Sequence, residues 1–199
     1  MARMSGIDFP ESRWFALGNG LSAFGVKRFD RCNGMRIPTL SMSGLLQADF
    51  RLPCLDYSDI LRATAMVTRS AKEREVQARR MVFNVIMYNQ DDHAKNFAFI
   101  LNENEEWQVS PAYELTFKTG PGGQHQSSVA GYGSRVSREA LLKAAKSADI
   151  NEKSLNLIIE GVSDVVRTFV TTGKALGDAI PAAVIKTTDA QIQANLRAL

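Results

Sequence analysis

The spacing of apolar residues changes part-way along the chain, and this change limits the folds open to it. Before residue 56 the apolar residues form short runs, and the runs 12–18 and 22–29 are separated by Asn19-Gly20. Asn-Gly between two such runs is a strong signal for a β-hairpin. After residue 56, apolar residues recur at the spacing of one helix face. The sequence therefore predicts an α+β fold that is predominantly helical and carries short β-hairpins.

Capping residues indicate where the predicted helices begin. Asp56 or Ser58 can cap a helix that contains Ile60 and Leu61, while Ser137 and Asn151 can cap two later ones. The helices capped by Ser137 and Asn151 are expected over about 138–148 and 152–176. Two others are expected over about 71–88 and, after Pro181, 182–198. The apolar residues of 152–176 that we expect in the core are Leu155, Ile158, Ile159, Val162, Val166, Phe169 and Val170.

Two other regions have no helical period. Residues 97–101 and 106–109 are short strand-like runs on either side of a turn, which predicts a second hairpin. Residues 30–54 are punctuated by glycine and proline, so a loop with some extended structure is expected there.

Composition excludes several classes of protein. The 199 residues include 24 Lys+Arg and 21 Asp+Glu, a net charge of +3, and 45% hydrophobic residues, as in one globular domain. No apolar run is long enough for a membrane span and no secretory signal is present, so a cytoplasmic protein is expected. Cys32 and Cys54, with His93 and His125, are too few for a zinc site. The basic residues of 69–80 alternate with glutamates, which indicates a solvated helix face and no direct nucleic-acid binding.

The polar octet 89–96, Asn-Gln-Asp-Asp-His-Ala-Lys-Asn, lies between a predicted helix and a predicted strand. Asp91 precedes Asn96 by five residues, the spacing of the catalytic loop of protein kinases. There the Asp accepts the proton of the substrate hydroxyl and the Asn binds Mg²⁺. Phosphoryl transfer needs such a base and a metal-binding oxygen close together.

The segment after Asn96 fits the same interpretation. The second hairpin should return residues 110–115 to the neighbourhood of Asn96, which makes Glu114 a second oxygen ligand for a metal. Residues 117–135 contain five glycines and are expected to form a long mobile loop. Helix, catalytic loop, hairpin, acidic residue and long loop follow one another in the order of a kinase C-lobe.

Several stretches resemble the HipA-like serine/threonine kinases of bacterial toxin–antitoxin systems. The matching stretches are 26–31, 43–50, 91–96, 110–113, 133–135 and 137–142. The resemblance covers nearly the whole chain from about residue 8, and the Asp-Asp-His-x-Lys-Asn string with Pro-Ala-Tyr is its most specific part.

The resemblance implies a role for each matching residue. Asp91 matches the catalytic base, His93 a residue that supports the transferred phosphate, and Asn96 a Mg²⁺ ligand. Phe29 and Asp30 match the hinge, where the backbone binds the adenine of ATP and the Asp contacts the ribose. Glu114 replaces the family's metal-binding Asp. Because its side chain is one methylene longer, weaker Mg²⁺ binding is expected.

The resemblance also implies a domain organisation. Residues 1–30 match the end of the small N-lobe and the hinge, and 31–199 match the large C-lobe. No glycine-rich phosphate loop is found, and the early lysine, Lys27, is next to the hinge. The chain is thus expected to lack the N-lobe that grips ATP.

Two functions follow from this organisation. The chain is the large lobe of a kinase that phosphorylates a protein hydroxyl, with aminoacyl-tRNA synthetases among the family's substrates. Alternatively, it is an inactive lobe that binds a HipB-like antitoxin or a separately encoded small lobe.

Simpler interpretations of the same residues stay open. Asp91, Asp92 and Asn96 can serve only to cap helix ends and turn the chain, and His93 can be a hydrogen-bonded structural residue. Asp30, between two arginines, can form a surface ion pair, which stabilises a fold little. Glu114 can be an ordinary surface residue.

Overall fold

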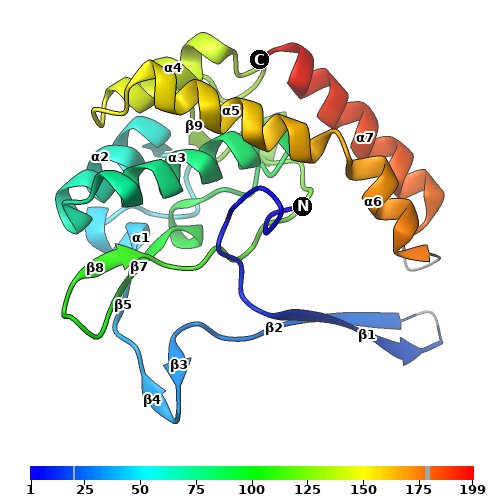
Figure 1. Cartoon of the computed structure of the whole chain (residues 1–199), viewed down its shortest axis with the longest axis horizontal. Coiled ribbons are helices and arrows are strands. Elements are labelled where there is room, and N and C mark those ends of the chain that lie inside the picture. The colour runs from blue at the N-terminus through cyan, green and yellow to red at the C-terminus, as the bar shows by residue number, and fades with distance from the viewer. Residues whose placement is uncertain (20, 178–179) are drawn as a thin grey trace.

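The computed structural model describes residues 1–19, 21–177 and 180–199. Most helices lie on one side of the molecule and the short strands on the other (Figure 1). This arrangement confirms the predicted, predominantly helical α+β class. In chain order the elements are β1 (Ser12–Gly18), β2 (Leu21–Val26), β3 (Arg31–Cys32), β4 (Met35–Arg36), β5 (Thr39–Ser41), α1 (Met42–Leu46), β6 (Leu55–Asp56), α2 (Tyr57–Thr68), α3 (Ala71–Ile86), the 3₁₀ turn η1 (Ala94–Asn96), β7 (Ala98–Leu101), β8 (Trp107–Val109), the 3₁₀ turn η2 (Pro121–Gly123), β9 (Ser127–Ser128), α4 (Arg138–Lys146), α5 (Glu152–Val166), α6 (Phe169–Ala175) and α7 (Ala182–Arg197).

Helix α3 is at the centre of the hydrophobic core. It packs against α2, α5 and α7, and its inner face includes the fully buried Met81, Val82 and Ile86. Burying side chains of this size contributes about 1.5–3 kcal/mol each. Within the described ranges, no helix is long and apolar enough to cross a membrane.

The predicted caps are present. Asp56 begins α2 with a capping box, in which its carboxylate accepts from the Ser58 N–H at 2.8 Å. Ser137 and Asn151 accept from the backbone N–H three residues on and begin α4 and α5.

The predicted single helix over 152–176 is wrong, because it is interrupted after Val166. The Thr168 hydroxyl donates to the Val165 carbonyl at 2.7 Å, a local bond that competes with the helical pattern. Helix α6 then begins at Phe169. Phe169 and Val170 are consequently only half-buried, whereas the predicted core residues of α5 are buried.

The strands form small sheets. Strands β5, β7 and β8 make a three-stranded antiparallel sheet, which contains the predicted second hairpin. Strand β6 pairs in parallel with β9, which joins residues 55–56 to residues 127–128. The segment 30–54 has the extended structure expected of it in β3, β4 and β5, and also a short helix, α1, that the sequence did not predict.

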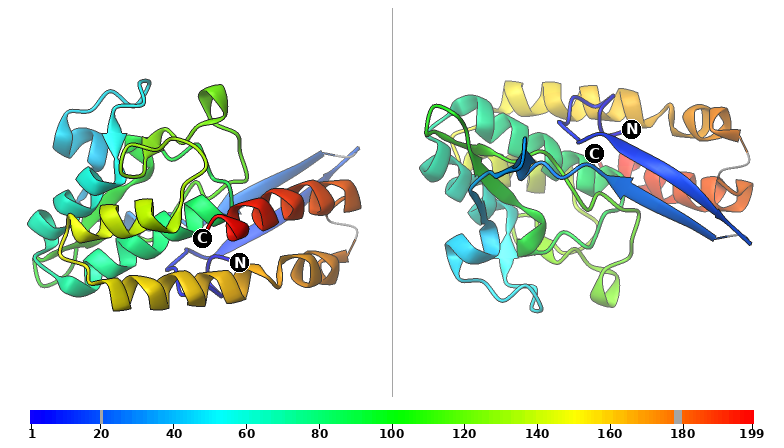
Figure 2. Two further views of the ribbon diagram at one scale, coloured as in Figure 1. Left: turned by 90° about the horizontal axis from the view of Figure 1, so that it is seen from above. Right: turned by 90° about the horizontal axis from the view of Figure 1, so that it is seen from below.

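The predicted first hairpin is β1 paired with β2, and Gly20 of its turn lies outside the described residues. The two strands form a long ribbon that extends in the same direction as α6 and α7 (Figure 2). Apolar side chains are exposed on it: Trp14 is 52% exposed, Phe24 64% and Leu21 67%. Trp14 and Phe24 are cross-strand partners and therefore share a face, while Phe15 points to the opposite one.

Candidate active site

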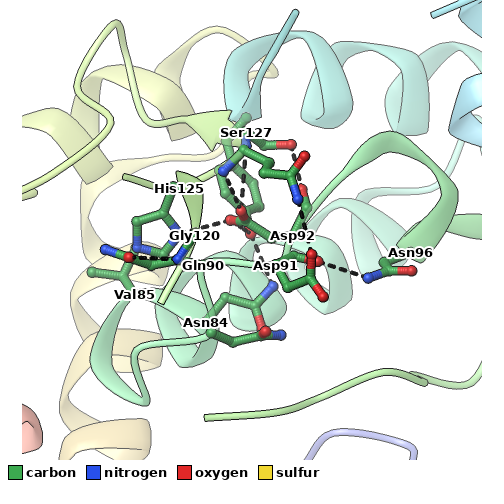
Figure 3. A network of polar contacts seen from close by, with 12 residues as sticks. Asn84, Val85, Gln90, Asp91, Asp92, Asn96, Gly120, His125 and Ser127 are labelled. Atoms are coloured by element: carbon green, nitrogen blue, oxygen red, sulfur yellow. Dashed lines mark hydrogen bonds and ion pairs between the residues drawn. The ribbon is translucent and has the colours of Figure 1, made fainter. Parts of the chain in front are cut away.

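The predicted catalytic loop connects α3 to β7, and its two ends are joined. The Asn96 side-chain N–H donates to the Asp91 carbonyl at 2.7 Å, and the Asn96 backbone N–H donates to the His93 carbonyl at 2.8 Å (Figure 3). The structure therefore brings Asp91 and Asn96 together. Since Asn96 uses its amide nitrogen in this bond, its Oδ1 is the atom left for a ligand.

The Asp91 carboxylate is partly exposed and has two partners. Lys118 Nζ lies 2.7 Å from Oδ2, and Gln126 Nε2 donates to Oδ1 at 2.8 Å. The Asp91 side chain is 25% exposed. A substrate hydroxyl can thus approach the carboxylate, although it must compete with Lys118 or Gln126 for an oxygen. Neither partner was predicted from the sequence.

Asp92, by contrast, is buried at the centre of a polar network (Figure 3). Its Oδ2 accepts from the Tyr57 hydroxyl at 2.9 Å and lies 2.8 Å from His125 Nδ1. Its Oδ1 accepts from the backbone N–H groups of Gln126 and Ser127 at 2.9 and 3.3 Å. Because a carboxylate with this many donors is well satisfied, Asp92 holds the loop in place.

Tyr57 extends this network to α3. Its hydroxyl accepts from Asn84 Nδ2 at 2.9 Å while donating to Asp92. Burial, together with the nearby Asp92 charge, raises the pKa of Tyr57 well above its ordinary value. The phenol therefore keeps its proton and remains a donor to Asp92.

The segment 117–135 is attached to the catalytic loop instead of forming the predicted mobile loop. Gln90 N donates to the Lys118 carbonyl at 3.0 Å, and Gly120 N donates to Gln90 Oε1 at 3.0 Å. A Cβ at Gly120 would lie 2.0 Å from the Gln124 carbonyl oxygen, so only glycine fits there. With Gln126 and Ser127 bound to Asp92, the segment covers one side of the catalytic loop.

Asp56 fixes the far end of this segment. Its carboxylate accepts from the Ser128 hydroxyl at 2.7 Å, from Gly131 N at 2.8 Å and from Ala130 N at 3.1 Å. Burial opposes ionisation of Asp56, but these bonds and those from Ser58 outweigh it and lower its pKa. The charged form therefore stabilises both the start of α2 and residues 128–131.

His93 lies beside Asp91 in the loop and is half-buried. Its ring meets Phe50 edge-on at 5.7 Å, and Lys95 Nζ is 3.5 Å from the centre of the same Phe50 ring. Its Nδ1 is buried and, in the part of the chain described, has no hydrogen-bond partner. This nitrogen therefore gives no support to the alternative that His93 is a hydrogen-bonded structural residue.

Glu114 follows the return strand, as predicted. The Tyr113 hydroxyl donates to the Lys95 carbonyl, which docks the returning segment on the loop. Glu114 itself is exposed, with φ 51°, and its backbone carbonyl accepts from Asn89 Nδ2 at 3.3 Å. Within the described residues its carboxylate has no hydrogen-bond or ion-pair partner, and no group of three or more His, Cys, Asp or Glu side chains that could hold a metal ion is found.

Glu114 instead shares a pocket with the predicted hinge. The pocket has a volume of about 480 Å³, and Phe29, Asp30, Tyr113 and Glu114 all line it. The Phe29 ring lies 5.4 Å from the Tyr113 ring. Burial raises the pKa of Tyr113 to about 12, so this wall of the pocket carries a neutral phenol.

Asp30 forms the surface ion pairs that the sequence left as an alternative. Arg28 donates to both of its carboxylate oxygens, at 2.8 and 2.6 Å, and Arg31 donates at 2.6 Å. The hydrogen bond from Arg28 is the main cause that lowers the pKa of Asp30 to about 2. A carboxylate has lone pairs for more than these donors, so a further contact is compatible with this geometry.

Arg80 is a buried residue near the site that sequence reasoning missed. Its guanidinium donates to the Ser110 carbonyl, at the start of the segment that leads to Tyr113. Burial lowers the pKa of Arg80 to about 10, and its Nε and Nη1 have no partner in the described part of the protein. The solvated helix face expected over 69–80 is therefore wrong at Arg80, because the sequence does not distinguish this arginine from the half-buried Arg74 and Arg79.

Comparisons with known proteins identify the family and the fold of the chain. Residues 1–169 match the family model described as HipA-like C-terminal domain. A protein of Sinorhizobium fredii (strain NBRC 101917 / NGR234), named "Putative kinase Y4dM", is 29% identical over 188 residues, which cover 85% of this chain and 45% of that protein.

A solved structure has the same fold. It is HipA of Shewanella oneidensis MR-1, in a complex of a toxin–antitoxin system with HipB and operator DNA. The TM-score is 0.75 at 13% identity, and the match covers 98% of this chain and 52% of that one. The chain therefore spans about half the length of these relatives. Together with the family model, these matches show that the chain belongs to the HipA-like C-terminal domain family.

Proposed function

We propose that the chain is the large lobe of a HipA-like Ser/Thr protein kinase, which transfers the γ-phosphate of ATP to a protein hydroxyl. In this reaction the hydroxyl oxygen forms a bond to the γ-phosphorus, the bond from that phosphorus to ADP breaks, and Asp91 accepts the hydroxyl proton. One observation carries the proposal: Asp91 and Asn96 are bonded across a short turn, and the Asp91 carboxylate is partly exposed.

The surroundings of Asp91 suit a general base. Lys118 and Gln126 each contact one oxygen of the carboxylate and so fix its orientation. Asp92, next in the chain, is held by four donors, so the loop does not have to reorganise when a substrate arrives. His93, beside Asp91, would support the transferred phosphate.

Oxygen ligands for Mg²⁺ are available in this chain. Asn96 has a free Oδ1 and Glu114 an unpaired, exposed carboxylate, and both are hard ligands of the kind Mg²⁺ prefers. When bound, Mg²⁺ would neutralise charge on the phosphates. Glu114 shares its pocket with Phe29 and Asp30, the residues proposed to contact adenine and ribose, so a nucleotide bound there would place its phosphates toward Glu114.

A second candidate function is that of a binding subunit, and the β1–β2 ribbon supports it. Trp14, Leu21 and Phe24 expose more apolar surface than an isolated domain usually does, on strands whose outer edges are unpaired in the described structure. A separately encoded small lobe would add strands to these edges. A HipB-like antitoxin is the other proposed partner, because the related Shewanella HipA is found with HipB.

Radiolabelled ATP tests the kinase proposal. The chain is incubated with Mg²⁺, labelled ATP and bacterial cytosolic proteins, including aminoacyl-tRNA synthetases. Loss of a general base lowers the rate by about 10²–10⁴-fold, so Asp91→Asn should abolish most of the labelling. Asp164→Asn, on the exposed face of α5, is the matched control and should label as the wild type does.

Equal labelling by the wild type and Asp91→Asn would overturn the kinase proposal. If the wild type labels nothing and does not bind Mg-ATP in a calorimeter, the binding-subunit candidate is favoured. That candidate in turn requires that a Trp14→Ser/Phe24→Ser double variant lose binding to a small-lobe or antitoxin partner.

A further inference from the structure

A second pocket lies behind the catalytic loop, on the side away from Asn96. It has a volume of about 530 Å³, in the range of small-molecule sites. It is formed between the end of α3, residues 134–136 and helix α7. Figure 3 shows its lining residues Val85, Gln90 and His125 on one side of Asp92, with Asn96 on the other.

The charges around this pocket favour an anion. Arg135 is the one charged side chain in its described lining, and no aspartate or glutamate is part of that lining. In the described portion of the chain Arg135 forms no salt bridge, unlike Arg28, Arg62 and Arg167. The Ser134 hydroxyl adds a neutral donor next to Arg135.

His125 provides a further polar group in the lining. Its side chain is only 4% exposed, and its Nδ1 lies 2.8 Å from Asp92 Oδ2. Because a carboxylate accepts and cannot donate, Nδ1 carries the proton in this bond. The other ring nitrogen, Nε2, has no hydrogen bond within the described residues and is the ring atom left to contact a ligand.

The remaining walls are apolar. They are lined by Val85 from α3, by Val136 and, from α7, by Ala194 and Ala198. An inorganic ion would leave this surface uncovered, whereas an organic anion would bury it. The pocket thus combines a few convergent polar groups with an apolar body, as small-molecule sites commonly do.

We propose that this pocket binds a small organic anion, whose carboxylate or phosphate group is held by Arg135 and Ser134 and whose apolar part packs on Val85 and Val136, beside His125. This inference goes beyond the proposed kinase function and requires neither ATP nor phosphoryl transfer. The pocket also communicates with Asp91, because His125 and Gln126 share Asp92 and Gln126 bonds to Asp91. A ligand beside His125 would therefore be linked to the proposed base, Asp91, through Asp92 and Gln126.

NMR of the full chain labelled at histidine tests the site, because His93 and His125 are the only two histidines. The probes are phenyl phosphate, benzoate and, as the uncharged control, benzyl alcohol. We expect saturable shifts of the His125 signals with one or both anions and none with the alcohol. The phosphate and carboxylate arms distinguish which head group the pocket prefers.

Arg135→Gln should weaken binding at least about tenfold, the effect of losing a hydrogen bond to a charged group. Arg36→Gln removes the same charge from the distant strand β4 and should leave the affinity unchanged. Asp91→Asn should still bind, so the outcome is independent of whether the chain is a kinase.

Three results would overturn the proposal. They are the absence of any His125 shift at millimolar anion, equal shifts with benzyl alcohol, and an unchanged affinity in Arg135→Gln. Circular dichroism of Arg135→Gln verifies that this exposed substitution leaves the fold intact.

Discussion

The predicted catalytic loop and the predicted hinge each contain an aspartate with several hydrogen-bond donors, but the two aspartates are held differently. Asp92 of the catalytic loop is buried and accepts from side chains and backbone of distant segments. Asp30 of the hinge is held by Arg28 and Arg31, its immediate neighbours on the surface. Buried groups of this kind are costly to disturb, whereas surface ion pairs are not.

This difference divides the proposed site into two parts. One part is held by contacts within this chain, and the other adjoins an apolar surface that this chain leaves exposed. The predicted catalytic loop is joined by hydrogen bonds to Gly120 and Gln126 of the same chain, and Asp56 holds the end of that segment. The hinge continues into the β1–β2 ribbon, whose apolar side chains are exposed. The base side of the proposed kinase is therefore complete in this chain, while the nucleotide side has apolar surface left for a partner.

The largest effect is expected from Asp92→Ala. It removes the acceptor of Tyr57, His125 and two backbone N–H groups, so the free energy of unfolding should fall by about 3–5 kcal/mol. Urea denaturation followed by circular dichroism measures it. Asp91→Ala, beside it in the loop, is the matched control and should cost less than about 1 kcal/mol. Equal losses in the two variants would remove the distinction between these neighbours.

Tyr57→Phe should have the next largest effect. It leaves Asn84 without its acceptor and Asp92 without one donor, which should cost about 1–3 kcal/mol in the same urea experiment. Tyr132→Phe, at a position that is 57% exposed, should change stability by less than about 0.5 kcal/mol. A Tyr57→Phe variant as stable as the wild type would show that the network does not depend on this hydroxyl.

A smaller, pH-dependent effect is expected from Asp56. Its pKa is lower in the folded protein than the ordinary value of 3.8, so its contribution to stability is complete above that value and is lost as the pH falls below it. The wild type should thus lose more stability on acidification than Asp56→Asn does. Urea midpoints at neutral pH and below pH 4 test this, and parallel pH profiles of the two proteins would contradict it.

The smallest effect on stability is expected from Asp30→Asn. Its partners are exposed arginines, so the free energy of unfolding should change by less than about 1 kcal/mol. If Asp30 contacts the ribose, the affinity for Mg-ATP in calorimetry should fall while stability does not. A loss of stability as large as that of Asp92→Ala would mean that the hinge is as firmly built into the fold as the catalytic loop.

What could be predicted from the sequence depended on the distance over which each signal acts. Asp56, Ser137 and Asn151 cap helices through N–H groups two or three residues away, and all three were predicted. The Asp91–Asn96 turn is equally local. Phe169 and Val170 misled the prediction because the apolar spacing continues across Thr168, whose hydroxyl bond ends the regular helix.

The contacts that complete the site act over long distances and left no local trace. Asp92 meets Tyr57 from 35 residues before it and His125 from 33 residues after it. The many glycines of 117–135 suggested freedom, whereas Gly120 is required by a close backbone approach to Gln124. No pattern in the sequence relates these segments to one another.

The parallel pairing of β6 with β9 has a consequence for the synthesis of the protein. It joins residues 55–56 to residues 127–128, and the same closure brings His125, Gln126 and Ser127 to Asp92. Proteins are made from the N-terminus, and such long-range pairings form only after the intervening chain exists. A growing chain that has passed Asn96 already carries Asp91, His93 and Asn96, but it cannot hold them in place until residues 125–128 have also been made.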